Sequence, residues 1–173
     1  MNNEELMSRL IALQNGDRTV FEEIYKGLQT PIYTVIFRIT RDKSVAEDIL
    51  QEVFVKLFVS LPKSPIKNPR AYIFQMARNL AIDGMRKQPQ FVSLDDIENT
   101  VYLQADDVTH KLDVENAMKT LPLNECQIVT LHINGELTFR EISEIMSIPL
   151  GTVLWKYQKA IGKLRSIISG GVL

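Results

Sequence analysis

The chain has 173 residues, of which 45% are hydrophobic and 24% are charged, and its formal net charge is −1. This length suits one medium domain or two small ones, and the composition is that of a globular protein with a packed core, which excludes extensive disorder. No apolar run approaches the roughly 18 residues of a membrane span, and the start MNNEELMSRL lacks the pattern of a signal peptide. The single cysteine cannot form an intramolecular disulfide. We therefore expect a cytoplasmic protein without membrane insertion.

The charges are distributed unevenly along the chain. Residues 62–90 contain six basic residues and one aspartate, a net charge of +5, whereas residues 91–117 contain seven acidic residues and one lysine, a net charge of −6. Residues 150–168 contain four basic residues and no acidic one. Two basic zones separated by an acidic segment indicate two sites for one polyanion, although chance clustering in a near-neutral protein gives the same pattern.

Residues 3–61 have the apolar periodicity of helices almost throughout. The first apolar set spans 6–13 and ends at an Asn-Gly turn at 15–16. The second set runs over 20–39, and the sequence leaves open whether Pro31 kinks or breaks this helix.

Ser44 and Glu47 have capping-box spacing and predict the start of a third helix. Its inner face is apolar over 45–58. The outward residues are Glu47, Asp48, Gln51, Glu52 and Lys56. From the charge pattern alone, this outward face is a solvated surface.

Three prolines within residues 61–69 predict a basic loop, which a helix from about Pro69 to Lys87 follows. The aromatic residues Tyr72 and Phe74 lie beside basic and amide groups, a composition suited to single-stranded nucleic acid. Core packing explains these rings equally well.

Periodicity fades over 88–107, where acidity rises and we expect a linker. A helix is predicted over 108–121, and Asn124 is predicted to cap the next helix, whose apolar residues lie within 128–131. The Asn-Gly pair at 134–135 ends that helix.

Residues 138–165 predict two helices joined by a tight turn. Thr138 and Glu141 form a capping box, and Pro149 stops the first helix at 147–149 but is well tolerated at the start of a second. The polar stripe of the second helix consists of Thr152, Lys156, Lys159 and Lys163. This pattern is typical of a helix-turn-helix whose second helix enters a major groove, and the alternative is a helical hairpin with a solvated lysine face.

Catalytic and metal-binding patterns are not found in the sequence. His110 and His132 lack zinc-ligand spacing, and there is no phosphate-binding glycine loop or nucleophile elbow. Cys126 is interpreted as a small packing residue. We therefore expect no enzyme activity, no cofactor and no metal site.

Four blocks carry a family resemblance: AEDILQEVF at 46–54, ARNLAIDGMRK at 77–87, LP at 121–122 and EIxxIMxIPLGTV at 141–153. In this order and spacing the chain resembles a bacterial RNA polymerase sigma factor of the sigma-70 family, extracytoplasmic-function (ECF) group, over about residues 5–168.

The resemblance implies an all-α protein with two small helical domains joined by an acidic linker. Residues 1–90 would bind core RNA polymerase and recognise and melt the minus-ten element of promoter DNA. Residues 91–107 would be the linker, and residues 108–173 would read the minus-thirty-five element with the helix-turn-helix. An anti-sigma factor is a further partner that the family allows.

The resemblance also implies three sets of functional residues. The set facing core polymerase is Asp48, Gln51, Glu52 and Phe54. The minus-ten set is Arg70, Tyr72, Asn79, Asp83, Arg86 and Lys87, with the loop 61–70 capturing a flipped base. The minus-thirty-five set is Thr138, Arg140, Glu141, Thr152, Trp155, Lys156, Lys159 and Lys163.

The sequence departs from the family pattern at several positions. Tyr72 replaces the usual tryptophan, Cys126 replaces an arginine, and Leu-Trp-Lys-Tyr at 154–157 replaces a polar run with arginine. Lysine lacks the planar fork with which arginine binds guanine or phosphate. We therefore predict that the final helix supplies affinity more than base discrimination. The ring of Trp155 is expected either on sugar or a thymine methyl, or buried against the preceding helix.

Two other functions remain open from the residues. An autonomous helix-turn-helix regulator would explain 141–164 but gives the blocks within 46–87 no role. A diverged interaction protein would keep polymerase binding and lose specific DNA reading.

Overall fold

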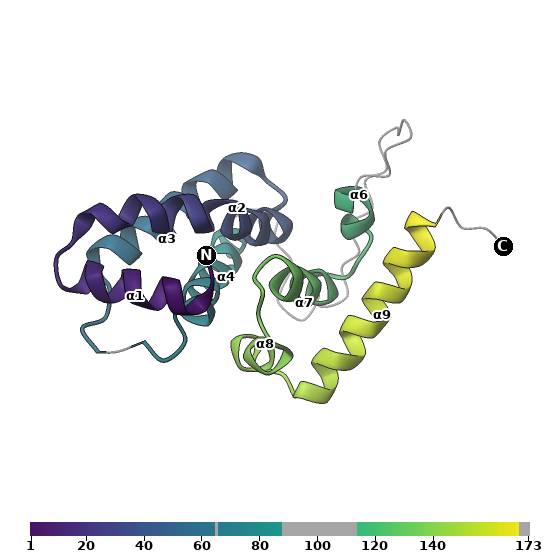
Figure 1. Ribbon diagram of the computed structural model, residues 1–173. Helices are drawn as coiled ribbons and strands as arrows, with labels where there is room; N and C mark the ends of the chain where they lie inside the picture. Colours follow the sequence, from purple (N-terminus) through teal and green to yellow (C-terminus); the bar gives the residue numbers. More distant parts are fainter. Residues whose placement is uncertain (65, 88–113, 170–173) are drawn as a thin grey trace.

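The computed structural model describes residues 1–64, 66–87 and 114–169, and every regular element in these ranges is a helix (Figure 1). The N-terminal half consists of α1 (Asn3–Gln14), the short 3-10 helix η1 (Arg18–Val20), α2 (Phe21–Thr40), α3 (Lys43–Val59) and α4 (Pro69–Arg86). The C-terminal half consists of α6 (Val114–Lys119), α7 (Leu123–Ile133), α8 (Phe139–Met146) and α9 (Leu150–Ile168). The all-α prediction is confirmed. The predicted linker at 91–107 and the predicted start of a helix at 108 lie outside the described residues.

The helix α2 is the central element of the N-terminal half, because it packs against both α3 and α4. Its buried stripe includes Ile24, Leu28, Ile32 and Ile36, at the four-residue spacing of one helical face. Pro31 lies inside α2 and does not break it. Of the two outcomes that the sequence left open, a break is therefore excluded, and the buried stripe continues on both sides of the proline.

Two predicted helix starts are wrong. The side chain of Asp42, not Ser44, caps α3, because it accepts the N–H of Val45 at 2.9 Å. Asn124 does not cap α7, which begins one residue earlier at Leu123. The preceding residue, Pro122, has an extended backbone, so the helix starts directly after it.

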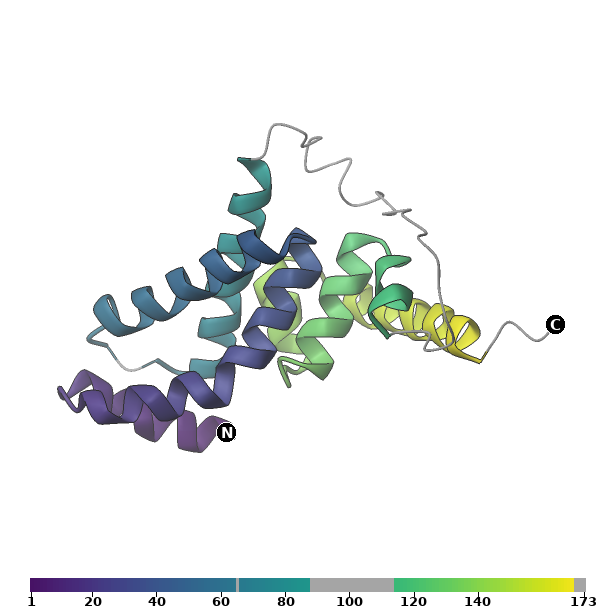
Figure 2. The same cartoon turned by 90° about the horizontal axis from the view of Figure 1, so that it is seen from above.

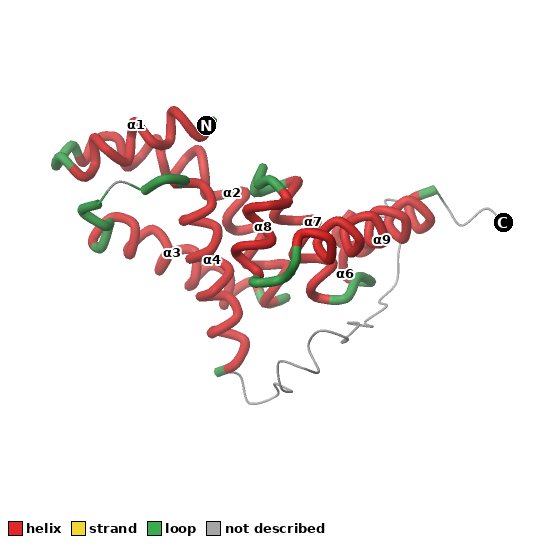
Figure 3. Tube along the Cα trace, turned by 90° about the horizontal axis from the view of Figure 1, so that it is seen from below, coloured by secondary structure: helices red, strands yellow, loops and turns green. Residues whose placement is uncertain are grey.

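The two halves pack against each other. The helix α7 lies against α2, and α8 lies against α4 (Figures 2 and 3). One buried apolar cluster continues from the N-terminal half into Ile128, Ile142 and Val153 of the C-terminal half. A smaller cluster that includes Met118 and Leu164 lies between α6, α7 and α9. Among the described helices, none combines the length and the apolar character needed to cross a membrane.

The cap of α3 generates a stability prediction. Asp42→Ala should lower the free energy of unfolding by about 1 kcal/mol, because it removes the acceptor for an N–H in the first turn. Ser44→Ala is the matched control, since Ser44 lies inside the helix and should change stability little. Urea unfolding of both variants measures the difference. Equal midpoints for the two variants would contradict the assigned cap.

Candidate protein and nucleic-acid interfaces

The outer face of α3 has three of the four residues expected to meet core polymerase. Asp48, Gln51 and Glu52 are exposed. Phe54 is only 3% exposed, and its ring packs at 4.6 Å from the ring of Tyr25, measured between centroids. Phe54 is therefore a core residue, and the prediction that its side chain contacts core polymerase directly is wrong.

Two valines that the sequence analysis did not select complete this face of α3. Val55 is 59% exposed and Val59 is 73% exposed. They follow Gln51 at intervals of four residues, so the three side chains lie along one face. The four-residue spacing from Gln51 could have indicated from the sequence that both valines lie on this outward face. We define the α3 surface as Asp48, Gln51, Glu52, Val55 and Val59.

The proline-containing loop before α4 is held at both ends by α1. The amide of Gln14 donates to the carbonyl of Pro62 at 2.5 Å, and the side-chain oxygen of Asn3 accepts the N–H of Arg70 at 3.3 Å. Asn68 caps α4 by accepting the N–H of Ala71 at 3.0 Å. Sequence patterns carry no signal for the two contacts with α1, because their partners are 48 and 67 positions apart in the chain.

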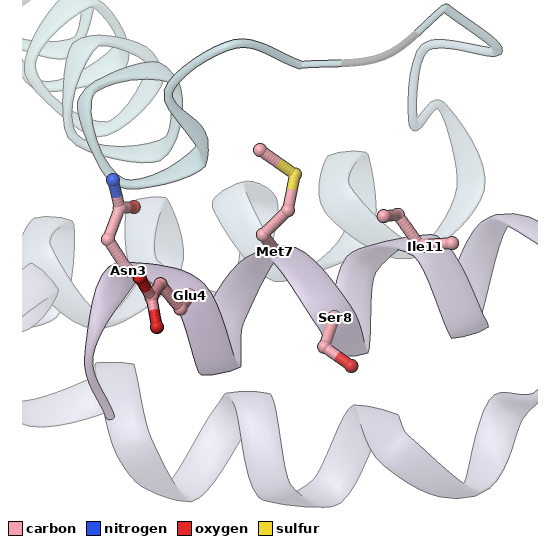
Figure 4. Close-up of a pocket in the computed structure, with 5 residues that line it drawn as sticks. All are labelled: Asn3, Glu4, Met7, Ser8 and Ile11. Carbon is pink, nitrogen blue, oxygen red and sulfur yellow. The ribbon is translucent and has the colours of Figure 1, made fainter.

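A shallow pocket runs along α1 beside this loop (Figure 4). Asn3, Met7 and Ile11 point toward the loop, whereas Glu4 and Ser8 lie on the other side of the helix in this view. Ile11 is 48% exposed. The pocket therefore combines the apolar side chains of Met7 and Ile11 with the polar groups of Asn3, Glu4 and Ser8.

The minus-ten residues separate into two groups along α4. Asn79, Asp83, Arg86 and Lys87 are exposed on its second half, where Arg86 and Asp83 form an ion pair at 3.5 Å. Tyr72 is half-buried. Phe74, the other aromatic considered for stacking, is fully buried, so core packing is the correct interpretation for that ring.

Arg70 points into the C-terminal half. Its side chain is buried, and its Nε donates to the carbonyl of Gly135 at 2.5 Å while its guanidinium pairs with Glu136 at 3.2 Å. Beside it, the amide of Asn68 donates to Glu141, whose other oxygen accepts the N–H of Thr138. The starts of α4 and α8 are thus joined directly, and Arg70 has no open surface.

Two further arginines of the N-terminal half reach across the same interface. Arg38 is 7% exposed, and it pairs with Glu115 at 2.5 Å and donates to Asn134 at 2.9 Å. Arg78 donates to the side chain of Gln127 at 2.7 Å, and burial lowers its pKa below the ordinary arginine value. Neither was selected from the sequence. The position of Arg38 within an apolar stripe was the available signal for it.

The predicted helix-turn-helix is confirmed as α8 and α9. Thr138 and Glu141 form the capping box of α8. Ser147, in the left-handed conformation, ends α8 before the turn to α9. Phe139 and Tyr157 lie 4.8 Å apart between ring centroids and both contact the ring of His132 on α7. This aromatic cluster joins α7, α8 and α9.

The basic stripe of α9 is partly neutralised. Lys159 and Lys163 pair at 3.3 and 3.1 Å with the carboxylate of Glu125, which comes from α7 and is 2% exposed. Lys156 and Arg140 form no ion pair with the described carboxylates. The helical spacing had suggested one row of equivalent charges at Lys156, Lys159 and Lys163. The structure shows instead that two of the three are paired with Glu125.

Trp155 is exposed, which excludes one of the two positions expected for it and leaves contact with sugar or a thymine methyl as a prediction. The residue is 58% exposed, so the predicted alternative, in which the ring is buried against the preceding helix, is wrong. The ammonium group of Lys159 lies 4.9 Å from the centroid of the ring. Thr152, on the same helix, is half-buried.

Cys126 is fully buried, and burial raises the pKa of its thiol. The interpretation as a packing residue is confirmed. Across residues 1–64, 66–87 and 114–169, no group of three or more His, Cys, Asp and Glu side chains has the arrangement of a metal site.

Solved structures share this fold. The sigma factor RpoE in its complex with the anti-sigma factor NepR from Bartonella quintana matches with a TM-score of 0.67 at 15% identity, over 87% of this chain and 97% of that chain. CnrH in complex with the cytosolic domain of CnrY matches with a TM-score of 0.68 at 14% identity, over 96% and 98%.

Sequence comparisons agree with the fold. Residues 24–90 match Sigma-70 region 2, and residues 117–166 match Sigma-70, region 4. The ECF RNA polymerase sigma factor SigW of Bacillus subtilis is 27% identical over 177 residues, covering 92% of this chain and 95% of the relative. SigM of the same organism is 30% identical over 157 residues, covering 87% and 96%. The chain therefore belongs to the sigma-70 family of RNA polymerase sigma factors, in the ECF group.

Proposed function

We propose that the two halves of this sigma factor divide promoter recognition between them. The protein binds core RNA polymerase and directs promoter-specific transcription initiation. In the proposal, a domain within residues 1–90 contacts polymerase and opens the minus-ten element, residues 91–107 are a linker, and a domain within 108–173 reads the minus-thirty-five element. Sigma factors are non-enzymatic initiation factors, and we expect no active site in this one. An autonomous regulator would leave the match at residues 24–90 without a role.

The observation that carries this proposal is the contact between the two DNA-reading parts. Asn68, at the start of α4, donates to Glu141 of the helix-turn-helix. The promoter elements lie roughly 25 base pairs apart, which is about 85 Å along the duplex. The proposed minus-ten residues lie within about 27 Å of Asn68 along α4, and α8, which joins α4 to α9, is only about 12 Å long. One packed molecule is therefore too small to reach both elements, so the halves separate on the promoter.

Separation of the halves is tested by measuring a distance in the free protein and in the holoenzyme on promoter DNA. Spin labels or dyes at Gln75→Cys and Gln158→Cys, both exposed, report the distance between α4 and α9. We expect one short distance in the free protein and one longer by tens of ångströms on the promoter. The same distance in both states would contradict the proposed opening.

A matched pair of variants tests what keeps the free protein packed. Arg38→Gln should increase the separated population, because it removes a buried charge whose partners come from the other half. Arg9→Gln removes an ion pair within the N-terminal half, to Glu23 at 2.7 Å, and should leave the distance unchanged.

The α3 surface is the proposed site for core polymerase. It combines carboxylates, an amide and two exposed valines, as protein interfaces with an apolar centre and a polar rim do. In the packed molecule it stays free of the C-terminal half, since α3 packs against α2 and α4. Polymerase can therefore bind this surface before the halves separate.

The combined substitution of Asp48→Ala and Gln51→Ala should weaken binding to core polymerase by about 1–2 kcal/mol, roughly five- to thirtyfold in Kd. Thermal stability should stay nearly unchanged because both side chains are exposed. Binding is measured by titration of labelled sigma factor with core enzyme, with Glu22→Ala on α2 as the control. Unaltered affinity of the folded double variant would reject this site.

The exposed second half of α4 is the proposed surface for the melted strand. Asn79, Asp83 and Arg86 lie on one face at intervals of four and three residues. The loop at 61–70 and Tyr72 lie toward the other end of the same helix. An amide can bond a base edge, and base stacking on a ring contributes roughly 1–3 kcal/mol.

Asn79→Ala should reduce opening of the minus-ten element in the holoenzyme, because it removes an exposed group that can bond an unpaired base. Permanganate reactivity of thymines in that element measures the opening. Thr30→Ala, an exposed position on α2, is the control. Full permanganate reactivity with Asn79→Ala, at equal holoenzyme occupancy, would count against this role.

An anti-sigma factor is a further proposed partner. RpoE of Bartonella quintana, which shares this fold, is seen with the anti-sigma factor NepR. A partner that contacted both halves would stabilise the packed arrangement and so oppose the separation that promoter binding requires.

A further inference from the structure

The start of α9 has an apolar surface that its polar stripe does not explain. Leu150 is 36% exposed, Leu154 is 38% exposed and Trp155 is 58% exposed. Trp155 lies two residues after the buried Val153 and five before the buried Ala160. At 100° per residue this places the indole on the face opposite the one that packs onto the protein.

The indole is held in place by charge. The ammonium group of Lys159 lies 4.9 Å from its ring centroid, and the same group pairs at 3.3 Å with the buried carboxylate of Glu125. A lysine between a carboxylate and an aromatic face has little freedom to move toward a phosphate. The cation covers part of the ring, and the rest of this 58% exposed residue offers apolar surface to solvent.

The surroundings of this surface fit a polyanion. No acidic residue occurs in α9, and neither Lys156 in its first half nor Arg140 at the start of α8 is paired with a described carboxylate. An apolar protein partner would not need these cations, whereas a DNA major groove offers phosphates at its edges and base edges at its floor.

We propose that Leu154 and Trp155 read the C5-methyl groups of thymines in the minus-thirty-five element. Thymine alone presents a methyl group in the major groove, and apolar side chains distinguish it by contact without hydrogen bonds. The proposal rests on the proposed function, in which α9 reads this element. The earlier expectation that the final helix supplies affinity more than base discrimination then holds only for its basic residues. Lys156 and Arg140 supply affinity through phosphates, while base discrimination comes from apolar contact.

Replacement of thymine by deoxyuridine removes only this methyl group and so tests the proposal directly. Minus-thirty-five duplexes are first selected with the holoenzyme from a pool in which that element is randomised. Each thymine of the selected element is then replaced singly by deoxyuridine. We expect at least one replacement to weaken binding about fourfold, the effect of exposing one buried methyl-sized group. A selected element without thymine, or equal binding of every deoxyuridine duplex, would overturn the proposal.

Variants locate the effect on the helix. Trp155→Ala or Leu154→Ala should bind the thymine and deoxyuridine duplexes equally, whereas Ile168→Ala, which removes an exposed apolar side chain at the far end of α9, should keep the fourfold difference. Retention of that difference by both Trp155→Ala and Leu154→Ala would overturn the assignment. Both substituted positions are exposed, so folding should be retained, and a urea midpoint checks this.

Lys156→Ala separates failure of this inference from failure of the proposed function. If it weakens binding to all duplexes and lowers the salt dependence by about one ion, α9 contacts the element, and the deoxyuridine result alone decides the inference. If Lys156→Ala, Leu154→Ala and Trp155→Ala all bind as the unaltered protein does, α9 does not read the element, and both proposals fail.

Discussion

The buried guanidinium of Arg38 is the constraint on which the packed arrangement depends. A charge placed within the apolar stripe of α2 destabilises the fold unless partners surround it. Its partners are Glu115, Asn134 and Thr130, all from the C-terminal half. The helix α2 can therefore bury this side only when α6 and α7 are docked on it.

Arg70 and Arg78 repeat the arrangement on α4. Arg70 directs its guanidinium to Gly135 and Glu136 of the C-terminal half and also donates to the carbonyl of Met1, and Arg78 donates to Gln127. Arginines that are satisfied by a partner can also be hydrated when that partner leaves, because a guanidinium remains charged in water. An interface of this kind can hold two halves together and still release them, unlike a purely apolar one.

The same principle shapes the surface for DNA. A helix with four basic residues and no acidic one looks uniformly cationic when taken alone. Glu125, buried beneath it, pairs with Lys159 and Lys163. Lys156 takes part in none of the described ion pairs, so it is the lysine of α9 that is available to phosphate. Exposed leucines and an indole take part of the surface that the charges would otherwise occupy. Affinity and base discrimination can thus reside in different side chains of one helix.

Local patterns in the sequence determined the all-α fold, the capping box at Thr138 and the helix-turn-helix, because helical periodicity and caps depend on residues within about one or two turns. The family blocks likewise identified the sigma-70 resemblance. The same periodicity put Phe54 within the inner apolar face at 45–58, which agrees with its burial, although the resemblance had assigned it to the polymerase-facing set. Only the tertiary structure decided where Arg70 points and which lysines are neutralised. Arg38 and Glu115 are 77 positions apart, and Lys163 and Glu125 are 38 apart. No pattern within one helix encodes such pairs, since they form only when separate helices pack together.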